Sequence, residues 1–428
     1  MLVFVINKNG EALMPCSNRK ARLLLKEQKA KIVNYKPFTI QLIYGSTGYK
    51  QETDLGVDIG SKHIGVAITS GNNVLTKGQI DLRQDVSKLI TTRKILRRSR
   101  RNRKTRYRQS RFLNRISCKK NGWLPPSIQS RINNTVNWIQ KFYNLLPKCT
   151  LHIEVGKFDI QKIENPNINS KEYQQGSMYE YRNRIAFLIS RENNTCQYCK
   201  EKYKKGDGWR LHHIWGKEKD RPQDWALIHE SCHKEIHKKK LESVLQKHKS
   251  KSFKDATFMN IIRIRLFNIF SKAKFTYGNI TFQDRIELNL DKTHYNDAIA
   301  ITGIKNIKLN PDSLFFIKQF RKKKKSLHEA TARKTKNGNT ESKRNNKNTK
   351  SLNGFNLNDC VRVFDKIGFI SGFTSGACYI KDIFNNYITI PNKSYKQINF
   401  SLLKVLSYNN NWQLIPHLKE GDFLPKEG

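Results

Sequence analysis

Alternating apolar and polar positions predict several short elements along the chain. The apolar run at residues 2–6 predicts a first strand. Residues 55–69 hold two apolar runs around a turn at Gly60–Ser61, which predicts a hairpin. A further short strand is expected at residues 151–155, and a helix is expected to begin near Tyr295. The hairpin, the strand and the helix each carry an acid beside the apolar run: Asp58, Glu154 and Asp297.

A stretch without this alternation follows at residues 90–120. It contains 14 lysines or arginines and no acid, and proline and glycine are absent until Gly122, which favours a helix. A helix that is polar on every side must bridge domains or bind something that neutralises it; a solvated charge run is the alternative. Arginine favours bidentate phosphate contacts. The arginines expected to bind nucleic acid are Arg97, Arg98, Arg100, Arg101, Arg103, Arg106, Arg108, Arg111 and Arg115.

The last third of the chain contains a second basic run and a different pattern. Residues 318–350 are rich in Lys, Asn, Thr and Ser with few apolar residues, which is typical of a linker or tail. Beyond this run, apolar and polar residues alternate with glycine at the turns, which predicts a small β domain.

Composition limits the classes of function. Lysine and arginine number 81 among 428 residues, against 35 acids, so the formal net charge is +46. Because 37% of residues are hydrophobic, the chain is not a disordered polycation. A nucleic-acid partner is the leading interpretation and an anionic membrane surface the weaker one. No run approaches a membrane-spanning helix, and the start lacks the pattern of a signal peptide, so we expect a cytoplasmic protein that spans no membrane.

The three acids suggest metal-dependent chemistry. Hydrolysis of a phosphodiester with divalent metal needs carboxylates that converge from rigid elements. Asp58, Glu154 and Asp297 fit that requirement, whereas any one of them alone could be a cap or a turn residue. His294 precedes Asp297 by three residues, so both lie on one face of the expected helix.

Cysteine and histidine spacing predicts a second site between the second and third acids. Two pairs about thirty residues apart have the spacing of a tetrahedral zinc site, with a redox role as the alternative for the first pair. These candidate zinc ligands are Cys196, Cys199, His229 and Cys232. His212 and His213 are adjacent on an expected strand, so one can bind metal while the other acts as a base. His233 and His237 lie one turn apart on a helix and can grip one ion.

The motifs resemble two nuclease families. GVDIGSKHIGVAI, HIEVGKFDIQK and HYNDA look like the split RuvC domain, an RNase H-like fold, in which Asp58, Glu154 and Asp297 would hold Mg²⁺ (or Mn²⁺) and His294 would activate water. LHHI followed by CHKEIH resembles the HNH, or ββα-metal, nucleases. That resemblance implies that His213 is the base, that His212 and His233 bind metal with His237 as a third ligand, and that the zinc is structural. Asp224 occupies the position of the family's asparagine, which orients the base.

The whole chain resembles the IscB family of transposon-encoded nucleases, relatives of the CRISPR type II effector nucleases. ALMPCSNRKARLLLKEQKAKIV looks like the family's PLMP domain, with Ala12 in place of the first proline. The implied fold is an α/β multidomain chain with a split RuvC core, an arginine-rich bridge helix and an inserted HNH domain. Expected boundaries are 1–52 for the PLMP domain, 53–80, 123–190 and 249–312 for RuvC, 81–122 for the bridge helix, 191–248 for HNH, 313–350 for a basic linker, and 351–428 for a C-terminal β-rich domain that contacts the target-adjacent motif.

The resemblance implies RNA-guided cleavage of double-stranded DNA. HNH would cut the guide-paired strand and RuvC the displaced strand, while the bridge helix grips a guide RNA that carries a structured scaffold. The expected protein is a monomer of the prokaryotic cytoplasm, associated with the nucleoid when it is on DNA. Two alternatives remain open: a protein-guided HNH enzyme of the homing or intron-encoded type, and a ribonucleoprotein scaffold without cleavage.

Overall fold

The fold is known from a computed structural model of the chain. It describes residues 2–45, 47–101, 122–164, 166–168, 178–203, 205–217, 220–245, 252–309, 314–321, 350–391 and 393–416. These residues form two compact units: one comprises residues 1–156 and 261–428, and the other comprises residues 157–260. Most of the predicted arginine helix after Arg101 and most of the basic linker lie outside the described residues.

The first unit begins with a four-stranded sheet of order β2-β1-β4-β3. Its strands are β1 (Val3–Ile6), β2 (Ala12–Cys16), β3 (Ala30–Tyr35) and β4 (Phe38–Leu42). Helix α1 (Asn18–Lys26) begins where the Ser17 hydroxyl accepts a hydrogen bond from the Lys20 amide, and its Ala21 packs into the core of this sheet. The strand predicted at the start of the chain is present as β1.

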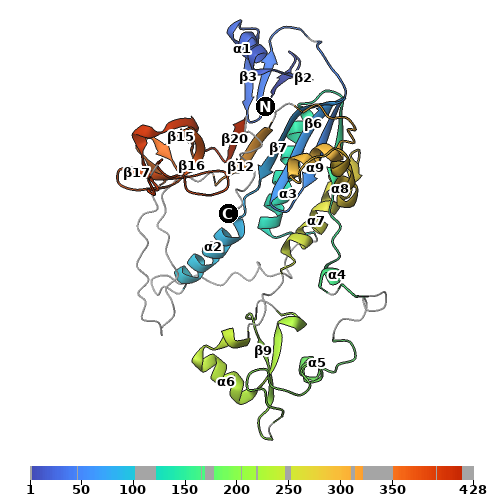
Figure 1. The fold of residues 1–428 in the computed structure, drawn as a ribbon, viewed down its shortest axis with the longest axis vertical. Coiled ribbons are helices and arrows are strands. Elements are labelled where there is room, and N and C mark those ends of the chain that lie inside the picture. The colour runs from blue at the N-terminus through green and yellow to red at the C-terminus, as the bar shows by residue number, and fades with distance from the viewer. Residues whose placement is uncertain are drawn as a thin grey trace. The chain divides into compact units, whose positions relative to one another are not determined.

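A seven-stranded mixed sheet of order β11-β8-β5-β6-β7-β12-β20 forms the centre of this unit (Figure 1). Strands β5 and β6 are the predicted hairpin, and they pair antiparallel, whereas β8 lies parallel to β5. The strands are β5 (Thr53–Ile59), β6 (His63–Ser70), β7 (Asn73–Asp81), β8 (Cys149–Glu154), β11 (Lys274–Thr276), β12 (Leu314–Gln319) and β20 (Trp412–Pro416). Strand β8 corresponds to the short strand predicted at residues 151–155.

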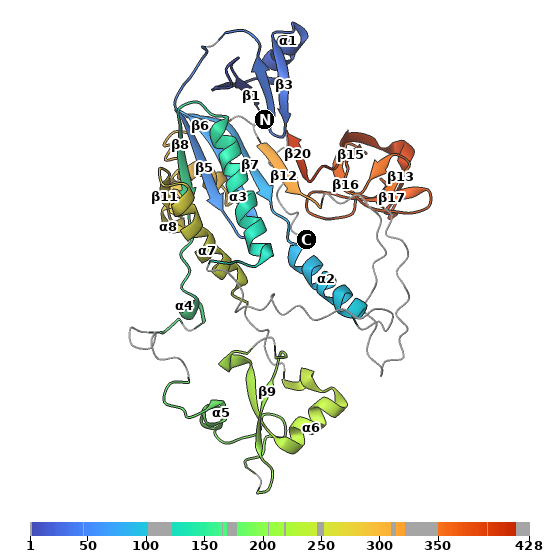
Figure 2. The same cartoon turned by 180° about the vertical axis from the view of Figure 1, so that it is seen from behind.

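Helices cover both faces of the central sheet (Figures 1 and 2). Neighbouring residues of β12 show this arrangement. The Phe315 ring packs against Phe142 of α3 (Pro126–Asn144) with 5.7 Å between centroids, whereas Phe316 packs with Tyr295 of α9 (His294–Ile301). Helix α9 is the predicted helix near Tyr295. It begins where the Thr293 hydroxyl accepts a hydrogen bond of 3.2 Å from the Asn296 amide. The remaining helices of this unit are α2 (Val86–Arg101) and α8 (Gly278–Glu287), together with the part of α7 (Lys254–Ile269) that follows residue 260.

The C-terminal segment is β-rich, as its alternating pattern predicts. Its antiparallel sheet has the order β18-β17-β16-β15-β19. The bounds are β13 (Ser351–Leu352), β14 (Phe355–Asn356), β15 (Cys360–Val363), β16 (Lys366–Phe373), β17 (Ala377–Lys381), β18 (Gln397–Asn399) and β19 (Lys404–Ser407). The final strand, β20, falls within the expected domain at 351–428, but it pairs with β12 at the edge of the central sheet instead of joining the C-terminal sheet.

The second unit is built on the antiparallel pair β9 (Trp209–His213) and β10 (Trp225–His229). Helix α6 (Glu230–Lys239) follows β10 directly, and buried Cys196, Ile228 and Ile236 form the core between them. Helix α5 (Arg184–Arg191) packs its Leu188 against Trp225 and Leu227. Helix α4 (Ile160–Glu164) and short 3₁₀ helices at residues 222–224 and 242–245 complete the unit. No helix among the described residues of the chain is both long and apolar enough to cross a membrane.

Candidate functional site

Three cysteines and one histidine converge at the start of α6. Cys196 and Cys199 lie in the loop after α5, His229 ends β10, and Cys232 lies in the first turn of α6. The ligand atoms of these four residues all lie within 4.8 Å of one another, and the Cys199 Sγ is 3.4 Å from the His229 Nδ1. The structure thus brings together the four residues that the spacing singles out.

The chemistry of this cluster fits a soft divalent cation. Burial and then the charge of Cys196 raise the pKa of the Cys232 thiol, so a bound cation would stabilise its thiolate form. The His229 Nε2 is buried without a hydrogen-bond partner among the described residues, and the Trp209 ring stacks on this imidazole at 4.5 Å. Three thiolates and one imidazole are a common donor set for structural zinc, so the cluster is consistent with Zn²⁺.

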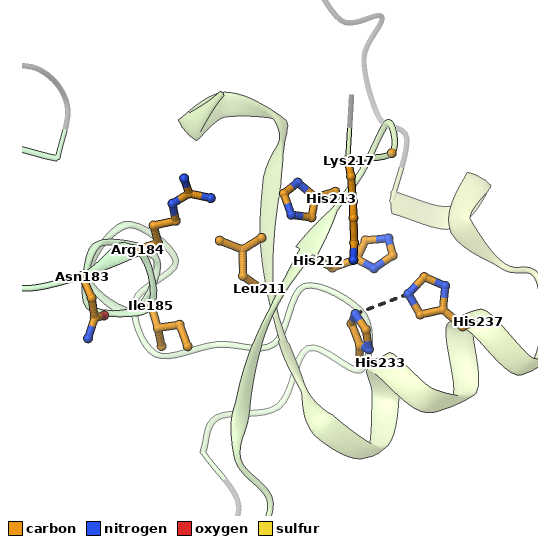
Figure 3. A pocket seen from close by; sticks show the side chains of 10 residues that line it. Asn183, Arg184, Ile185, Leu211, His212, His213, Lys217, His233 and His237 are labelled. Carbon is orange, nitrogen blue, oxygen red and sulfur yellow. Dashed lines mark hydrogen bonds between the residues drawn. The ribbon is translucent and has the colours of Figure 1, made fainter. Parts of the chain in front are cut away.

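A second cluster joins His212 of β9 to His233 and His237 of α6 (Figure 3). The two helical histidines are one turn apart, and their Nε2 atoms lie 3.3 Å from each other. The His212 ring lies 5.5 Å from the His233 ring and 5.1 Å from the His237 ring, measured between centroids. All three imidazoles therefore present nitrogen atoms to one point, and they line a pocket of about 890 Å³.

The state of these imidazoles suits a metal ligand. His212 is 1% exposed, and neither ring nitrogen has a hydrogen-bond partner among the described residues. Burial and then the charges of His237 and His233 lower the pKa of His212 to about 4. Its imidazole is therefore neutral at neutral pH, which is the form that binds metal. The Glu242 carboxylate lies 3.3 Å from the His237 Nδ1, an arrangement that fixes the ring of a ligating histidine.

His213 follows His212 on β9 and projects to the other side of the strand (Figure 3). Its Nδ1 is buried without a hydrogen bond among the described residues, and the Asp220 Oδ1 lies 3.6 Å away. Asp224, the residue expected to orient His213, is fully buried and places its Oδ2 2.9 Å from the Arg221 Nε. Asp220 could not be predicted from the sequence, because it lies in the irregular loop between β9 and the 3₁₀ helix, where no periodic pattern marks a residue.

The acids of the predicted carboxylate site come from neighbouring elements of the central sheet. Asp58 of β5 and Glu154 of β8 are register partners on parallel strands, so they lie side by side. Helix α9 packs over β5 and β6 and supplies His294 and Asp297. The His294 Nδ1 lies 2.6 Å from the Asp58 Oδ2. The structure therefore gathers the four residues in one region, although their ligand atoms do not all come within 4.8 Å of one another.

Two glycines of the central sheet allow the backbone of α9 to lie directly against strands β5 and β6. A Cβ atom on Gly56 of β5 would lie 2.0 Å from the Ala298 carbonyl oxygen, and a Cβ atom on Gly65 of β6 would lie 1.8 Å from the His294 carbonyl oxygen. Any larger residue at either position would collide with the backbone of α9. The glycines of GVDIG and HIG thus set the distance at which the histidine and acid of α9 meet Asp58.

Asp58, Glu154 and Asp297 are partly or fully buried, and their negative charges repel one another. Burial and then the charge of Asp58 raise the pKa of Glu154 to about 7. The same two causes raise the pKa of Asp297, although the Arg285 Nε lies 2.8 Å from its Oδ1. Burial would lower the pKa of His294, but the hydrogen bond to Asp58 and the charges of Asp58, Asp297 and Asp81 together outweigh burial and raise this pKa. A bound divalent cation would relieve this repulsion, so the donor set fits a hard metal ion.

Three residues beside the carboxylates were not predicted from the sequence. Arg285 of α8 is nearly buried and pairs with Asp297. His63 lies at the start of β6, its Nδ1 is 2.5 Å from the Asp81 Oδ1, and its ring stacks on that of His294 at 5.7 Å between centroids. His63 belongs to the motif SKHIG, but its spacing alone could not reveal an interaction with the end of β7.

Of the nine arginines predicted to bind nucleic acid, four fall in the described part of α2: Arg97, Arg98, Arg100 and Arg101. The helix predicted there is present from Val86, and the Arg97 side chain is exposed. Arg103, Arg106, Arg108, Arg111 and Arg115 lie outside the described residues.

Two family models match separate parts of the chain. Residues 3–176 match the model described as RRXRR protein, and residues 196–239 match the model described as HNH endonuclease. An RRXRR region followed by an HNH endonuclease domain decides the family resemblance. The chain is IscB-like. No curated protein matches it.

In the IscB-like chain, each of the two matched regions contains residues of one candidate site. The RRXRR region covers Asp58 and Glu154, and it includes the literal sequence RRSRR at residues 97–101. The HNH region begins at the first zinc-cluster cysteine and includes the three-histidine cluster and His213. His294 and Asp297 lie outside both matches, as does helix α5. An HNH endonuclease domain makes the protein a nuclease, and therefore a hydrolase.

Proposed function

We propose that this nuclease is an RNA-guided endonuclease that cuts both strands of DNA. The HNH site would cut the strand paired to the guide RNA, and a RuvC-type site at the carboxylates would cut the displaced strand. The observation that carries the proposal is the pairing of Asp58 with Glu154 across β5 and β8, with α9 supplying His294 and Asp297. This arrangement is a second candidate centre, distinct in its residues from the HNH site, and one site per strand explains a double-strand cut.

The charge distribution supports a nucleic-acid partner. A net charge of +46 needs a polyanion, and the run that begins RRSRR in α2 would bind the phosphates of a structured guide RNA. Guide pairing would provide sequence specificity, while the C-terminal sheet would contact the motif beside the target. In this proposal the protein acts as a monomer with one RNA and one DNA duplex.

In the HNH site, His213 would take a proton from the attacking water. His212, His233 and His237 would hold Mg²⁺ (or Mn²⁺), which would supply Lewis-acid stabilisation of the charge that develops on the phosphate. His212 is neutral at neutral pH because of its low pKa, so it can donate a lone pair without first losing a proton. The Cys196–Cys199–His229–Cys232 cluster would hold Zn²⁺ and fix the start of α6.

In the carboxylate site, Asp58, Glu154 and Asp297 would hold Mg²⁺. His294 would activate the water. Its Nδ1 lies against Asp58, which leaves Nε2 as the nitrogen that can accept a proton. Arg285 would keep the Asp297 carboxylate in place through their ion pair.

Strand-resolved cleavage tests the proposal. RNA that co-purifies with the full chain is sequenced, and a duplex matching its candidate guide segment is placed beside a randomised flank with a different label on each strand. Asp58→Ala should leave a nickase for the guide-paired strand, and His213→Ala should leave the complementary nickase. Cutting without RNA would support the protein-guided alternative instead, and intact DNA with wild-type protein and a defined RNA would support a scaffold. Loss of both cuts from either substitution would refute two independent sites.

A further inference from the structure

We infer that Asp220 positions the His213 imidazole in the HNH site, and that Arg184 of α5 and Trp225 of β10 hold Asp220 in place. The inference rests on the proposed role of His213 as the base. It assigns the orienting function to a residue other than Asp224 and extends the site to a helix outside the HNH match.

The His213 imidazole requires a partner at Nδ1. A histidine that accepts a proton through Nε2 must carry its own proton on Nδ1, and an acceptor beside Nδ1 selects that tautomer. The Nδ1 atom is buried and makes no hydrogen bond within the described parts of the chain, while the Asp220 Oδ1 lies 3.6 Å from it. Catalytic hydrogen bonds are often long before substrate binds, and a shift of less than about 1 Å would close this one.

Three contacts fix the Asp220 carboxylate. The Trp225 Nε1 donates a hydrogen bond of 2.8 Å to Oδ1, and the Arg184 Nη1 lies 3.0 Å from Oδ1 and 3.1 Å from Oδ2. The Arg184 guanidinium also lies over the Trp225 ring, 4.7 Å from its centroid. Trp225 is the cross-strand partner of His213, so the residue that anchors Asp220 is itself set by the β9–β10 register.

The residue at the family's asparagine position has other contacts. The Asp224 Oδ2 pairs with the Arg221 Nε at 2.9 Å, and its carbonyl oxygen accepts a hydrogen bond from the Ile214 amide. These contacts tie the 3₁₀ helix to the end of β9. The carboxylate found beside the His213 Nδ1 belongs instead to Asp220.

Helix α5 completes the arrangement. The Asn183 side chain accepts a hydrogen bond of 2.8 Å from the Ala186 amide, which fixes the start of α5 and so the place of Arg184. Arg184 and His213 line the same pocket (Figure 3). Because α5 precedes residue 196, a fragment cut at the boundary of the HNH match would lack the residue that holds Asp220.

The test compares Asp220→Ala with Asp220→Asn in the full chain bound to its co-purified RNA. Single-turnover cleavage of the guide-paired strand is measured with saturating duplex. We expect Asp220→Ala to slow this cut 10- to 100-fold, the usual effect of losing a group that orients a functional histidine. Asp220→Asn should restore most of the rate, because the Trp225 Nε1 directs the amide oxygen to the Oδ1 position. Duplex affinity, zinc content and cutting of the displaced strand should not change.

Glu235→Ala is the matched control. Glu235 is as exposed as Asp220, at 41%, and its carboxylate pairs with Lys239 one turn further along α6 in the same unit. Its loss should leave the rate unchanged. A wild-type rate for Asp220→Ala, or equal losses for Asp220→Ala and Asp220→Asn, would overturn the inference while the proposed function stands. A wild-type rate for His213→Ala would overturn both.

Discussion

Gly65 provides a direct test of how the carboxylate site is assembled. In Gly65→Ala, the new Cβ would lie 1.8 Å from the His294 carbonyl oxygen and 2.3 Å from its carbonyl carbon, whereas real Cβ contacts essentially never fall below 3.0 Å. The obstacle is backbone, so no side-chain rotation can relieve it. The start of α9 must therefore move away from β6 by more than 1 Å, and His294 and Asp297 move with it.

The size of the effect follows from that displacement. Overpacking of this kind typically costs about 1–3 kcal/mol of stability. A misplacement of about 1 Å at a catalytic group can cost about 100-fold in rate. We expect Gly65→Ala to slow cutting of the displaced strand by about that factor, while the guide-paired strand is cut as before because the HNH residues lie in the other unit.

The assay is the strand-resolved cleavage described above, with urea unfolding to confirm that the variant remains folded. Gly208→Ala is the control, since the nearest atom to a Cβ there is the Glu230 Oε2 at 3.7 Å, an ordinary contact. Wild-type cutting of the displaced strand by folded Gly65→Ala would refute the conclusion that the close approach of α9 to β6 positions His294 and Asp297 for catalysis. Equal slowing of both strands would do so as well.

Two further predictions concern stability. Cys199→Ser should release zinc, measured by atomic absorption, and cost several kcal/mol in unfolding of the HNH unit; a zinc-free variant that still melts at the wild-type temperature would contradict this. Glu154 has a folded pKa of about 7, above its ordinary value, so the folded chain keeps a proton that the unfolded chain loses. Stability of the metal-free protein should therefore fall by up to about 3 kcal/mol as pH rises from about 4.5 to about 7. Glu154→Gln should remove the largest part of that fall in urea titrations at pH 5 and pH 8, and the raised pKa values of Asp297 and His294 should account for the remainder. An unchanged fall would show that Glu154 does not cause it.

The hairpin, β8 and α9 could be predicted because local sequence determines them. Apolar runs of four to eight residues with a glycine turn between them specify β5 and β6, and the Thr293 cap marks the start of α9. The zinc cluster could be predicted as well, because each ligand pair is separated by only two residues along the chain. Strand β20 was not predictable, since its alternation suits either sheet and only long-range packing joins it to β12.

Within both sites, some residues could be predicted from the sequence and others could not. Chemistry that depends on regular elements is visible in the spacing: adjacent histidines on β9 diverge, and histidines one turn apart on α6 converge. Residues that tune the chemistry come from elsewhere and have no fixed spacing. Asp220 reaches His213 from a loop, and Arg285 reaches Asp297 from α8.

For the residue that orients His213, the family pattern and the structure favour different carboxylates. Asp224 stands at the expected position in the chain, yet its carboxylate pairs with Arg221, whereas Asp220 stands beside the His213 Nδ1. A position in a motif specifies where the backbone passes, and a loop of a few residues can place a different side chain against the same imidazole. Arg184 and Trp225 contact the Asp220 carboxylate. Substituting Asp220 and Asp224 one at a time therefore shows which of the two carboxylates orients His213. Asp224→Asn should then affect stability through Arg221, and Asp220→Ala should affect the rate.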